Sequence, residues 1–470
     1  MIENDSIEQK SLVLEIFSKI ISNFSSKAYL ELRFHQKQST SLVLEKHKLR
    51  KSRYDINSGI GIRVLSNGSW GFTHTSELSY PMALKAANQA LKIANLLSDE
   101  NSQKVKLDDS QLTVGTYYSP EEIRSINIPI EEKISLLKDC ESLIYNDPRI
   151  TSSYLSYHEP HELKVIYTSD GAKVEIFDTR PDFYVSVYAK ENNKFVSHSE
   201  SLSKLGGWEI FNQNAPFDIV KEAKKTAIDF LQAPGIDSGI KRIILDPTMV
   251  GLICHEAIGH TVEADFVIAG SGTENHLEKL VANEKITMVD DGRQIGMGWT
   301  PVDDEGVESK TVQIIKNGVL KSYLHNRVTA EYFSTQSTGN ARAFSFDNEP
   351  VIRMRNTYLE PGRNSWIRDE IISETKDGIL LAGDGEGQAD STTEFMFTAL
   401  KPYKIENGEI TTLLKPCTIS GMAFDVLKNV DAVSRDNWRL AMGNGYCYKL
   451  QPAKVDGGGS TIRTIAMVSS

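Results

Sequence analysis

Strand-like segments follow one another in runs along this chain, and tight-turn sequences join several of them. Asn-Gly pairs at 67–68, 317–318 and 407–408 each separate two such segments. Asn and Gly tolerate the positive φ that two-residue hairpin turns require. Runs of strands that do not alternate one-for-one with helices are typical of α+β folds. We therefore predict an α+β fold with a largely antiparallel sheet.

Helical patterns interrupt these runs and indicate how the chain divides. Apolar residues recur at helical spacing in the first 24 residues, and an alanine-rich helix is predicted from Pro81 to Leu97. A further helix, at about Ile219–Leu231, must end where Pro and Gly follow it at 233–239. We place a domain boundary there. Residues 1–235 are predicted to form an N-terminal α+β domain with helices on the sheet, and residues 236–470 a strand-rich C-terminal domain.

Charge and hydropathy exclude several classes of partner. The chain has 470 residues and a formal net charge of −11. This acidic balance argues against nucleic acid or an anionic membrane surface as the main partner. The basic cluster Lys46–Arg53 has no interleaved aromatic residues and is interpreted as a solvated edge or loop. No export signal and no apolar stretch near the roughly 20 residues of a membrane span is visible. We expect a cytoplasmic protein with reduced cysteines.

The segment that carries most chemistry follows Asp246-Pro247, where a helix is predicted to start. His255, Glu256 and His260 lie within six positions of this apolar segment. Histidines five apart are separated by about 140° in an ideal α-helix, so both reach one metal ion only if the helix loosens, ends or bulges between them. Gly259 is predicted to supply that backbone freedom. The alternative is a pair of hydrogen-bonded histidines without a metal.

A catalytic zinc ion typically has three protein ligands, so two histidines leave one ligand to be found. The candidates are Glu263, Asp265 and a distant cysteine. Among the cysteines Cys447 is attractive because the turn-forming 443–445 precedes it, whereas Cys254 adjoins His255 and is expected to point elsewhere. The remaining two, Cys140 and Cys417, are interpreted as packing residues. The residues alone leave the third ligand open.

Glu256, beside the first histidine, is the candidate general base. A glutamate at this position can take a proton from a metal-activated water as that water attacks a carbonyl. Mixed imidazole and thiolate ligation favours zinc over magnesium or calcium.

The segment His255-Glu256-Ala257-Ile258-Gly259-His260 and its continuation Glu263-Ala264-Asp265-Phe266 resemble the HExxxH signature of the TldD/PmbA metallopeptidases, also called the modulator of DNA gyrase family. The HExxxH motif marks the TldD-type subunit and is absent from the PmbA/TldE type. Further family-like stretches span nearly the whole chain: Gly59–Leu65 with Gly71-Phe72, Asp303–Gly306, Gly318–Leu324, Thr338–Arg342, Asn356–Gly362, Gly385–Asp390, Tyr403–Gly408 and Gly443–Cys447.

The resemblance implies that His255, His260 and Cys447 hold a zinc ion and that Glu256 is the general base. It also implies a two-domain α+β subunit, and a homodimer or a heterodimer with a PmbA/TldE-type paralogue. The expected function is a zinc-dependent peptidase that hydrolyses peptide bonds of short or unfolded peptides through a zinc-activated water. The alternative is a non-catalytic regulatory or binding subunit of the same fold, with a structural or absent metal; Glu256 argues against it.

The chain departs from the family pattern at Thr261 and Ala264, where glycine is common, and at Tyr448 after the cysteine. A bulky Tyr448 beside the metal is expected to reshape the pocket.

The acidic segment Asp303–Gly306 is interpreted as a solvated turn, with substrate positioning as the alternative. The glycine-rich Gly383–Gly387 lacks the Lys-Ser/Thr of a phosphate loop and is predicted to be an edge strand in one wall of the peptide channel.

Overall fold

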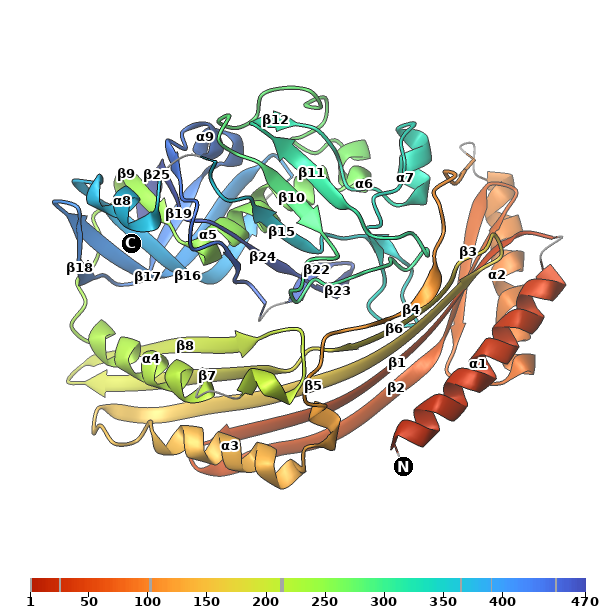
Figure 1. Cartoon of the computed structure of the whole chain (residues 1–470), viewed down its shortest axis with the longest axis horizontal. Helices are drawn as coiled ribbons and strands as arrows, with labels where there is room; N and C mark the ends of the chain where they lie inside the picture. The colour runs from red at the N-terminus through yellow and green to blue at the C-terminus, as the bar shows by residue number, and fades with distance from the viewer. Residues whose placement is uncertain are drawn as a thin grey trace.

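The computed structural model describes residues 2–24, 27–100, 104–211, 215–363, 366–389, 391–443 and 446–470. Figure 1 shows a long curved N-terminal sheet with the C-terminal elements packed against one side of it. Asn444 and Gly445 of the predicted turn before Cys447, and Asp390, lie outside the described residues.

The N-terminal sheet has eight strands in the described part of the chain. The strand order is β3-β2-β1-β5-β6-β4, and β7 pairs with both β5 and β8. The pair β4–β6 is parallel, whereas β1 is antiparallel to both β2 and β5. The strands are β1 (Tyr29–Glu45), β2 (Lys48–Ser66), β3 (Ser69–Thr75), β4 (Val114–Tyr118), β5 (Ile150–Thr168), β6 (Lys173–Thr179), β7 (Asp182–Glu191) and β8 (Lys194–Ser203).

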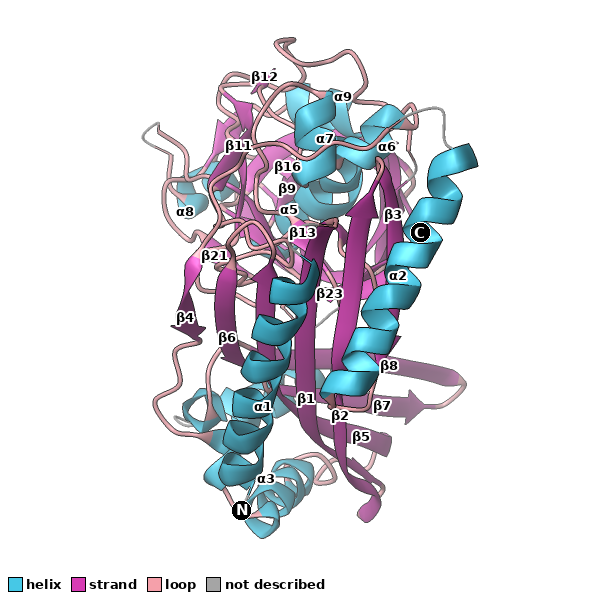
Figure 2. Ribbon diagram, turned by 90° about the vertical axis from the view of Figure 1, so that its right-hand side faces the viewer, coloured by secondary structure: helices cyan, strands magenta, loops and turns pink. Residues whose placement is uncertain are grey.

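Helices cover this sheet at both ends. In Figures 1 and 2, α1 and α2 lie across the face of the sheet that is turned away from the C-terminal elements. Phe17 and Ile20 of α1 and the alanine face of α2 pack with Leu32 and Ile62 of the sheet, so apolar burial holds these layers together. A separate apolar cluster joins helices α3 and α4 to strand β7. These elements are α1 (Ile2–Phe24), α2 (Tyr80–Glu100), α3 (Ile130–Ser142), α4 (Ala215–Phe230) and the short η1 (Ser125–Asn127) and η2 (Trp208–Phe211).

All three predicted Asn-Gly hairpins are confirmed. Asn67, Asn317 and Asn407 have φ of 49°, 48° and 54°, and the glycine after each has φ between 77° and 83°. Positive φ at both central residues matches the right-handed twist of the flanking strands. The turns join β2 to β3, β11 to β12 and β17 to β18.

A closed barrel forms one part of the C-terminal half. Its sheet order is β16-β9-β25-β19-β17-β18, with β20 on β25, and β17 also pairs with β16. The last pairing closes five strands into a ring, so each of the five pairs with a neighbouring strand on both sides. Beyond Leu381, β16 pairs with β17 alone, so Gly383–Gly387 lies at a strand edge, as predicted. The strands are β9 (Gly239–Leu245), β16 (Asp377–Ala389), β17 (Glu394–Glu406), β18 (Glu409–Leu413), β19 (Cys417–Met422), β20 (Ala432–Val433) and β25 (Ile462–Ser469).

A six-stranded sheet of order β12-β11-β10-β15-β24-β21 and two small hairpins complete the described C-terminal strands. The sheet contains β10 (Met288–Asp291), β11 (Thr311–Lys316), β12 (Val319–Leu320), β15 (Asn356–Leu359), β21 (Arg439–Leu440) and β24 (Asp456–Gly459). The hairpins are β13 (Ala341–Arg342) with β14 (Val351–Ile352), and β22 (Tyr446–Lys449) with β23 (Gln451–Lys454). The helical elements are α5 (Pro247–Leu252), η3 (Ile253–Gly259), η4 (His260–Val262), α6 (Ala264–Ile268), α7 (Arg327–Tyr332), α8 (Arg368–Ser373) and α9 (Ala423–Lys428).

A buried ion network links the N-terminal sheet to the C-terminal half. Arg63 of β2 donates to both carboxylate oxygens of Glu31, over 2.8 and 3.0 Å, and to Glu305 over 2.6 Å. Tyr29 donates its hydroxyl to Glu31, and the Arg327 backbone N–H donates to Glu305. We call Glu31, Arg63 and Glu305 the junction network.

The junction network overturns one expectation from the sequence. The segment Asp303–Gly306 was expected to be a solvated turn. Gly306 does turn the chain, with φ of 83°, but Asp303, Asp304 and Glu305 are all buried. The composition of this segment is typical of an exposed turn, but its cations come from distant positions: Arg63 pairs with Glu305 from 242 positions away, and Lys164 pairs with Asp304 from 140 positions away.

The α+β prediction is confirmed, because the fold is strand-rich, its sheets are mainly antiparallel and helices cover the N-terminal sheet. The domain boundary at residue 235 stays a prediction. Among the helices of the described ranges, none combines the length and the apolar character needed to cross a membrane.

Candidate metal centre

The helix that carries the motif changes its winding at the point where the histidines begin. The Asp246 side chain accepts a hydrogen bond from the Met249 backbone N–H and caps the start of α5. From Ile253 to Gly259 the helix is π-helical, and it then tightens into the 3₁₀ turn η4. A π-helix closes i→i+5 hydrogen bonds, so residues five apart come onto one face. The predicted loosening between His255 and His260 is confirmed.

The reason predicted for Gly259 is wrong. Gly259 has φ of −55° and ψ of −48°, which any residue adopts in a right-handed helix. A Cβ at this position would lie 1.9 Å from the sulfur of Met354 and 2.9 Å from the Cys254 carbonyl oxygen. Glycine is therefore needed for close packing and not for backbone freedom.

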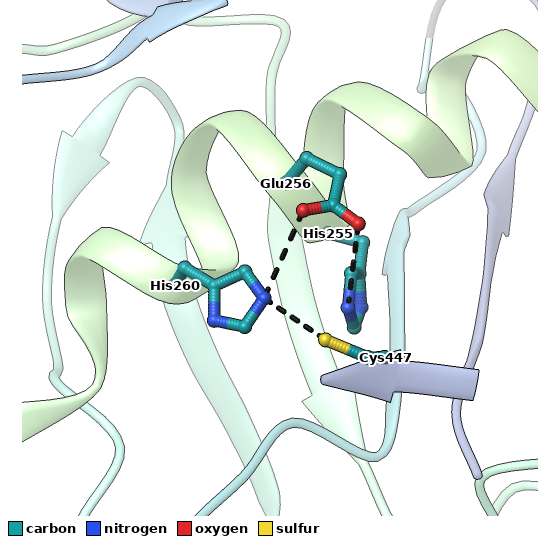
Figure 3. Close-up of side chains that lie close together, drawn as sticks. All are labelled: His255, Glu256, His260 and Cys447. Carbon is teal, nitrogen blue, oxygen red and sulfur yellow. Dashed lines mark hydrogen bonds and ion pairs between the residues drawn. The ribbon is translucent and has the colours of Figure 1, made fainter. Parts of the chain in front are cut away.

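Four side chains converge at this helix. Ligand atoms of His255, Glu256, His260 and Cys447 all lie within 4.8 Å of one another. Figure 3 shows the first three on the helix and Cys447 approaching from strand β22. His260 Nε2 is 3.0 Å from Cys447 Sγ and 3.8 Å from Glu256 Oε2, and His255 Nε2 is 4.0 Å from Glu256 Oε1. The two imidazole centroids are 5.3 Å apart. The geometry brings together the two histidines, the glutamate and the cysteine that the sequence singled out.

His255 is the member of this cluster whose ring nitrogens are unsatisfied. Its side chain is 1% exposed, yet neither Nδ1 nor Nε2 has a hydrogen-bond partner. Burial, with the nearby charge of His260, holds the pKa of His255 well below its usual value, so the imidazole is neutral. Buried polar atoms are normally satisfied, and an orphaned pair calls for a partner outside the chain. A neutral imidazole beside a thiol fits the donor set of zinc.

The other ring nitrogen of His260 is held by a carboxylate. Nδ1 of His260 lies 3.2 Å from Glu263 Oε2, and that oxygen also accepts from Lys449 Nζ over 2.8 Å. Lys449 further donates to both Asp265 oxygens over 2.8 Å and to the Ile352 carbonyl over 3.2 Å. Glu263 and Asp265, weighed above as ligands, therefore lie on the far side of His260 from Cys447. A carboxylate on the non-ligating nitrogen fixes the tautomer and orientation of a metal-binding histidine.

Cys447 is held through its backbone. Arg353, which is fully buried, donates to the Cys447 carbonyl over 2.8 Å and to the Gln451 carbonyl over 2.7 Å. It thus joins the two strands of the hairpin that presents the thiol. Arg342 donates to the Lys454 carbonyl over 2.6 Å at the other end of the same hairpin. The position of Cys447 therefore depends on cations that come from outside the hairpin.

The surroundings of the cluster raise the pKa of two of its members, His260 and Glu256. Burial opposes protonation of His260, but Glu263 and Cys447 outweigh it and raise the pKa of His260 to about 10. Burial also raises the pKa of Glu256 above the ordinary value for a glutamate. A raised pKa brings a carboxyl closer to the range in which it both accepts and returns a proton.

A cleft of about 670 Å³ opens onto the cluster. Glu256 and His260 line its base, and Phe266, Tyr448 and Leu450 contribute apolar surface. Gly387 and Ala389, at the edge of β16, also line it, close to the wall predicted for the glycine-rich segment. Cys140, Cys254 and Cys417 are buried free thiols away from the cluster.

Sequence reasoning missed Lys449 and Arg353. Both act through contacts with residues between 94 and 186 positions away. Neither belongs to a motif whose spacing points to a metal, so the chain carries no local signal for them.

Mixed imidazole, thiolate and carboxylate donors at the base of a cleft define a candidate zinc centre of the hydrolytic kind. Profiles of the PmbA/TldA metallopeptidases match the chain in three parts: domain 1 over residues 30–94, the central domain over 123–231 and the C-terminal domain over 238–462. The chain belongs to the PmbA/TldD metallopeptidase family.

Individual relatives agree with this assignment. A metalloprotease of Methanocaldococcus jannaschii is 34% identical over 94% of this chain and 97% of its own. A zinc metalloprotease TldD homologue of Saccharolobus solfataricus is 29% identical over 93% of this chain and 95% of its own. The fold matches the crystal structure of a proposed DNA gyrase modulator from Thermotoga maritima with a TM-score of 0.78, 22% identity, and coverage of 97% and 99% of the two chains. It also matches TldE of Thermococcus kodakarensis, with a TM-score of 0.73, 17% identity, and coverage of 97% and 100%.

Proposed function

We propose that this protein is a zinc-dependent peptidase that hydrolyses peptide bonds of short or unfolded peptides. The observation that supports the proposal most is the pair of unsatisfied ring nitrogens on buried His255, within ligand reach of His260 and Cys447. The naming of relatives as metalloproteases supports the same reaction class. His255, His260 and Cys447 are the proposed ligands.

When bound, zinc would polarise the scissile carbonyl and lower the pKa of a water molecule. The Glu256 carboxylate takes the proton from the attacking water and returns it to the leaving amine nitrogen. Glu263 and Lys449 keep His260 oriented with Nε2 toward the cluster. Arg353 holds the Cys447 carbonyl and so fixes the thiol. The peptide would bind in the cleft that Glu256 and His260 line, beside the buried His255.

The second candidate is a regulatory or binding subunit of the same fold. The description of the Thermotoga maritima structure as a gyrase modulator favours it. Glu256 argues against it, because a structural zinc site normally closes its fourth position with a protein ligand and needs no free carboxylate beside it.

Partners and location follow from the same reasoning. We propose a homodimer or a heterodimer with a PmbA/TldE-type paralogue, and a cytoplasmic location. The likeness to a TldE structure supports the choice of paralogue. Nucleic acid and membranes are not proposed as partners, because the net charge is −11.

The Glu256→Gln variant tests the proposed reaction. We expect hydrolysis of an unfolded protein substrate to fall by about 10²–10⁴-fold, while zinc per chain stays at the wild-type value. Glu278→Gln, at an exposed glutamate paired with Lys321, is the matched control and should keep full activity. Measurements are made on the chain alone and with a PmbA/TldE-type paralogue added. Full activity of Glu256→Gln would overturn the assigned role.

A further inference from the structure

The hairpin that carries Cys447 also carries two large apolar side chains that folding leaves in solvent. Tyr448 is 73% exposed and Leu450 is 81% exposed, although Cys447 and Lys449 on the same hairpin are buried. Alternation along β22 sends Cys447 and Lys449 toward the helix and Tyr448 away from it. Single exposed apolar residues are common, but these two lie within three positions of a proposed ligand and line the same cleft as Glu256 and His260.

Leu450 also occupies a backbone conformation that leucine rarely adopts. Its φ is 59°, at the turn between β22 and β23. Glycine or asparagine would adopt this left-handed conformation at lower energy. A leucine here therefore gains nothing from burial and adds strain to the turn. Strained residues of this kind gather at ligand-binding positions, where another contact offsets the cost.

Phe266 extends the apolar surface toward the metal centre. Its side chain is 38% exposed, and its ring centroid is 6.3 Å from that of His260 and 4.1 Å from Lys449 Nζ. The cleft thus places these apolar side chains beside Glu256 and His260 of the metal-centre cluster. The volume of about 670 Å³ lies within the range of pockets that hold small ligands.

Charged residues share the cleft with the apolar side chains. Glu256 and Asp265 both line it. Lys449, which lines the cleft as well, is already bound by Glu263 and Asp265. A large apolar side chain that enters the cleft covers Phe266, Tyr448 and Leu450, whereas a small or polar side chain gains little from this surface.

We propose that Phe266, Tyr448 and Leu450 form an apolar subsite beside the metal centre, which takes a large apolar side chain of the bound peptide. The proposal rests on the proposed peptidase function. It assigns the substrate class of the same site: peptides with a bulky apolar residue next to the scissile bond.

Peptide binding to the zinc-loaded full-length Glu256→Gln variant tests the subsite without turnover. The probes are fluorescein-labelled Gly/Ser peptides with one central Phe, Leu, Ser or Asp, measured by fluorescence anisotropy. Covering one large side chain is expected to make the Phe and Leu peptides bind about tenfold or more tighter than the Ser and Asp peptides. Adding Tyr448→Ser and Leu450→Ser should reduce this preference to less than about threefold.

Ile240→Ser is the matched control. Ile240 is 73% exposed, like Tyr448, but lies on β9 and does not line the cleft. It should leave the preference unchanged. Equal binding of all peptides, binding of none, or an undiminished preference in the Tyr448/Leu450 variant would each overturn the subsite. A change of oligomeric state in that variant, seen by light scattering, would also overturn it by assigning both residues to a subunit interface.

Cleavage assays separate this proposal from the proposed function. Wild-type cleavage of all four peptides at equal kcat/KM would overturn the subsite and leave the peptidase standing. Preferential binding of the apolar peptides would support the subsite. If the zinc-loaded wild type, alone and with a PmbA/TldE-type paralogue, cleaved none of them, the result would contradict the peptidase.

Discussion

The metal-centre cluster and the junction network are both buried and both charged, yet their polar atoms are satisfied differently. All four carboxylate oxygens of Glu31 and Glu305 accept hydrogen bonds from Arg63, Tyr29 or Arg327. Both ring nitrogens of His255 are without a partner. The carboxylates of the junction network are satisfied within the chain, whereas the metal-centre cluster needs something from outside it. Burial and charge alone therefore do not separate these two clusters, whereas the unsatisfied ring nitrogens of His255 do.

The largest effect on stability is expected in the junction network. Arg63→Met leaves Glu31 and Glu305 buried without their shared cation, which is expected to lower the free energy of unfolding by about 3–5 kcal/mol. Urea unfolding measures the loss, and zinc per chain should stay unchanged in the folded variant. Arg50→Met, at an exposed pair with Glu45, should change stability by less than about 1 kcal/mol. A comparable loss in both variants would remove the distinction between the two kinds of ion pair.

A smaller and different effect is expected at Lys449. Lys449→Met removes the cation that holds Glu263 against His260, so zinc affinity is expected to fall by about 10–100-fold. Chelator competition measures the affinity. The visible spectrum of the cobalt-substituted protein reports ligand geometry, which a loss of stability alone would not alter. Lys321→Met, at an exposed lysine, is the control. Unchanged zinc affinity and an unchanged cobalt spectrum in Lys449→Met would show that Lys449 does not position His260.

The smallest effect concerns a second buried histidine, His325, two positions before Arg327, whose backbone N–H donates to Glu305 of the junction network. Its Nδ1 is 3.2 Å from the Thr329 hydroxyl, so it has a partner where His255 has none. Burial lowers the pKa of His325 to about 4, against about 6.5 in the unfolded chain. The unfolded state therefore binds more protons between these values, and stability falls as the pH drops below about 6.5.

The expected contribution of His325 is a loss of about 1 kcal/mol between about pH 7 and pH 5.5. Urea unfolding of wild type and His325→Gln at both pH values measures this contribution. Between them, the free energy of unfolding of the wild type should fall by about 1 kcal/mol more than that of the variant. Parallel pH profiles would show that His325 is not neutral and buried as described.

The sequence was sufficient where the determinants are local. The Asn-Gly hairpins and the helix start at Asp246-Pro247 depend on neighbouring residues, and each is found as predicted. The helix also loosens between His255 and His260, as one shared metal ion would require. Gly259 was singled out correctly for the wrong reason, since the atom that it accommodates belongs to Met354, 95 positions away.

Contacts between distant segments could not be predicted in the same way. The burial of Asp303–Gly306 could not be predicted because the cations that pair with Glu305 and Asp304, Arg63 and Lys164, come from the N-terminal sheet. The roles of Arg353 and Lys449 depend on backbone carbonyls and carboxylates that only the fold brings near them. Cys447 was identifiable among the candidates, although 187 positions separate it from His260.

Zinc content tests the central claim most directly. Elemental analysis of purified protein, prepared without added zinc, is made on wild type, Cys447→Ala and the control Cys417→Ala, whose thiol is buried outside the cluster. The account predicts about one zinc per chain in wild type and in Cys417→Ala, and its loss in Cys447→Ala. Well-folded wild type without zinc even after reconstitution, or a Cys447→Ala variant that keeps it, would contradict the account.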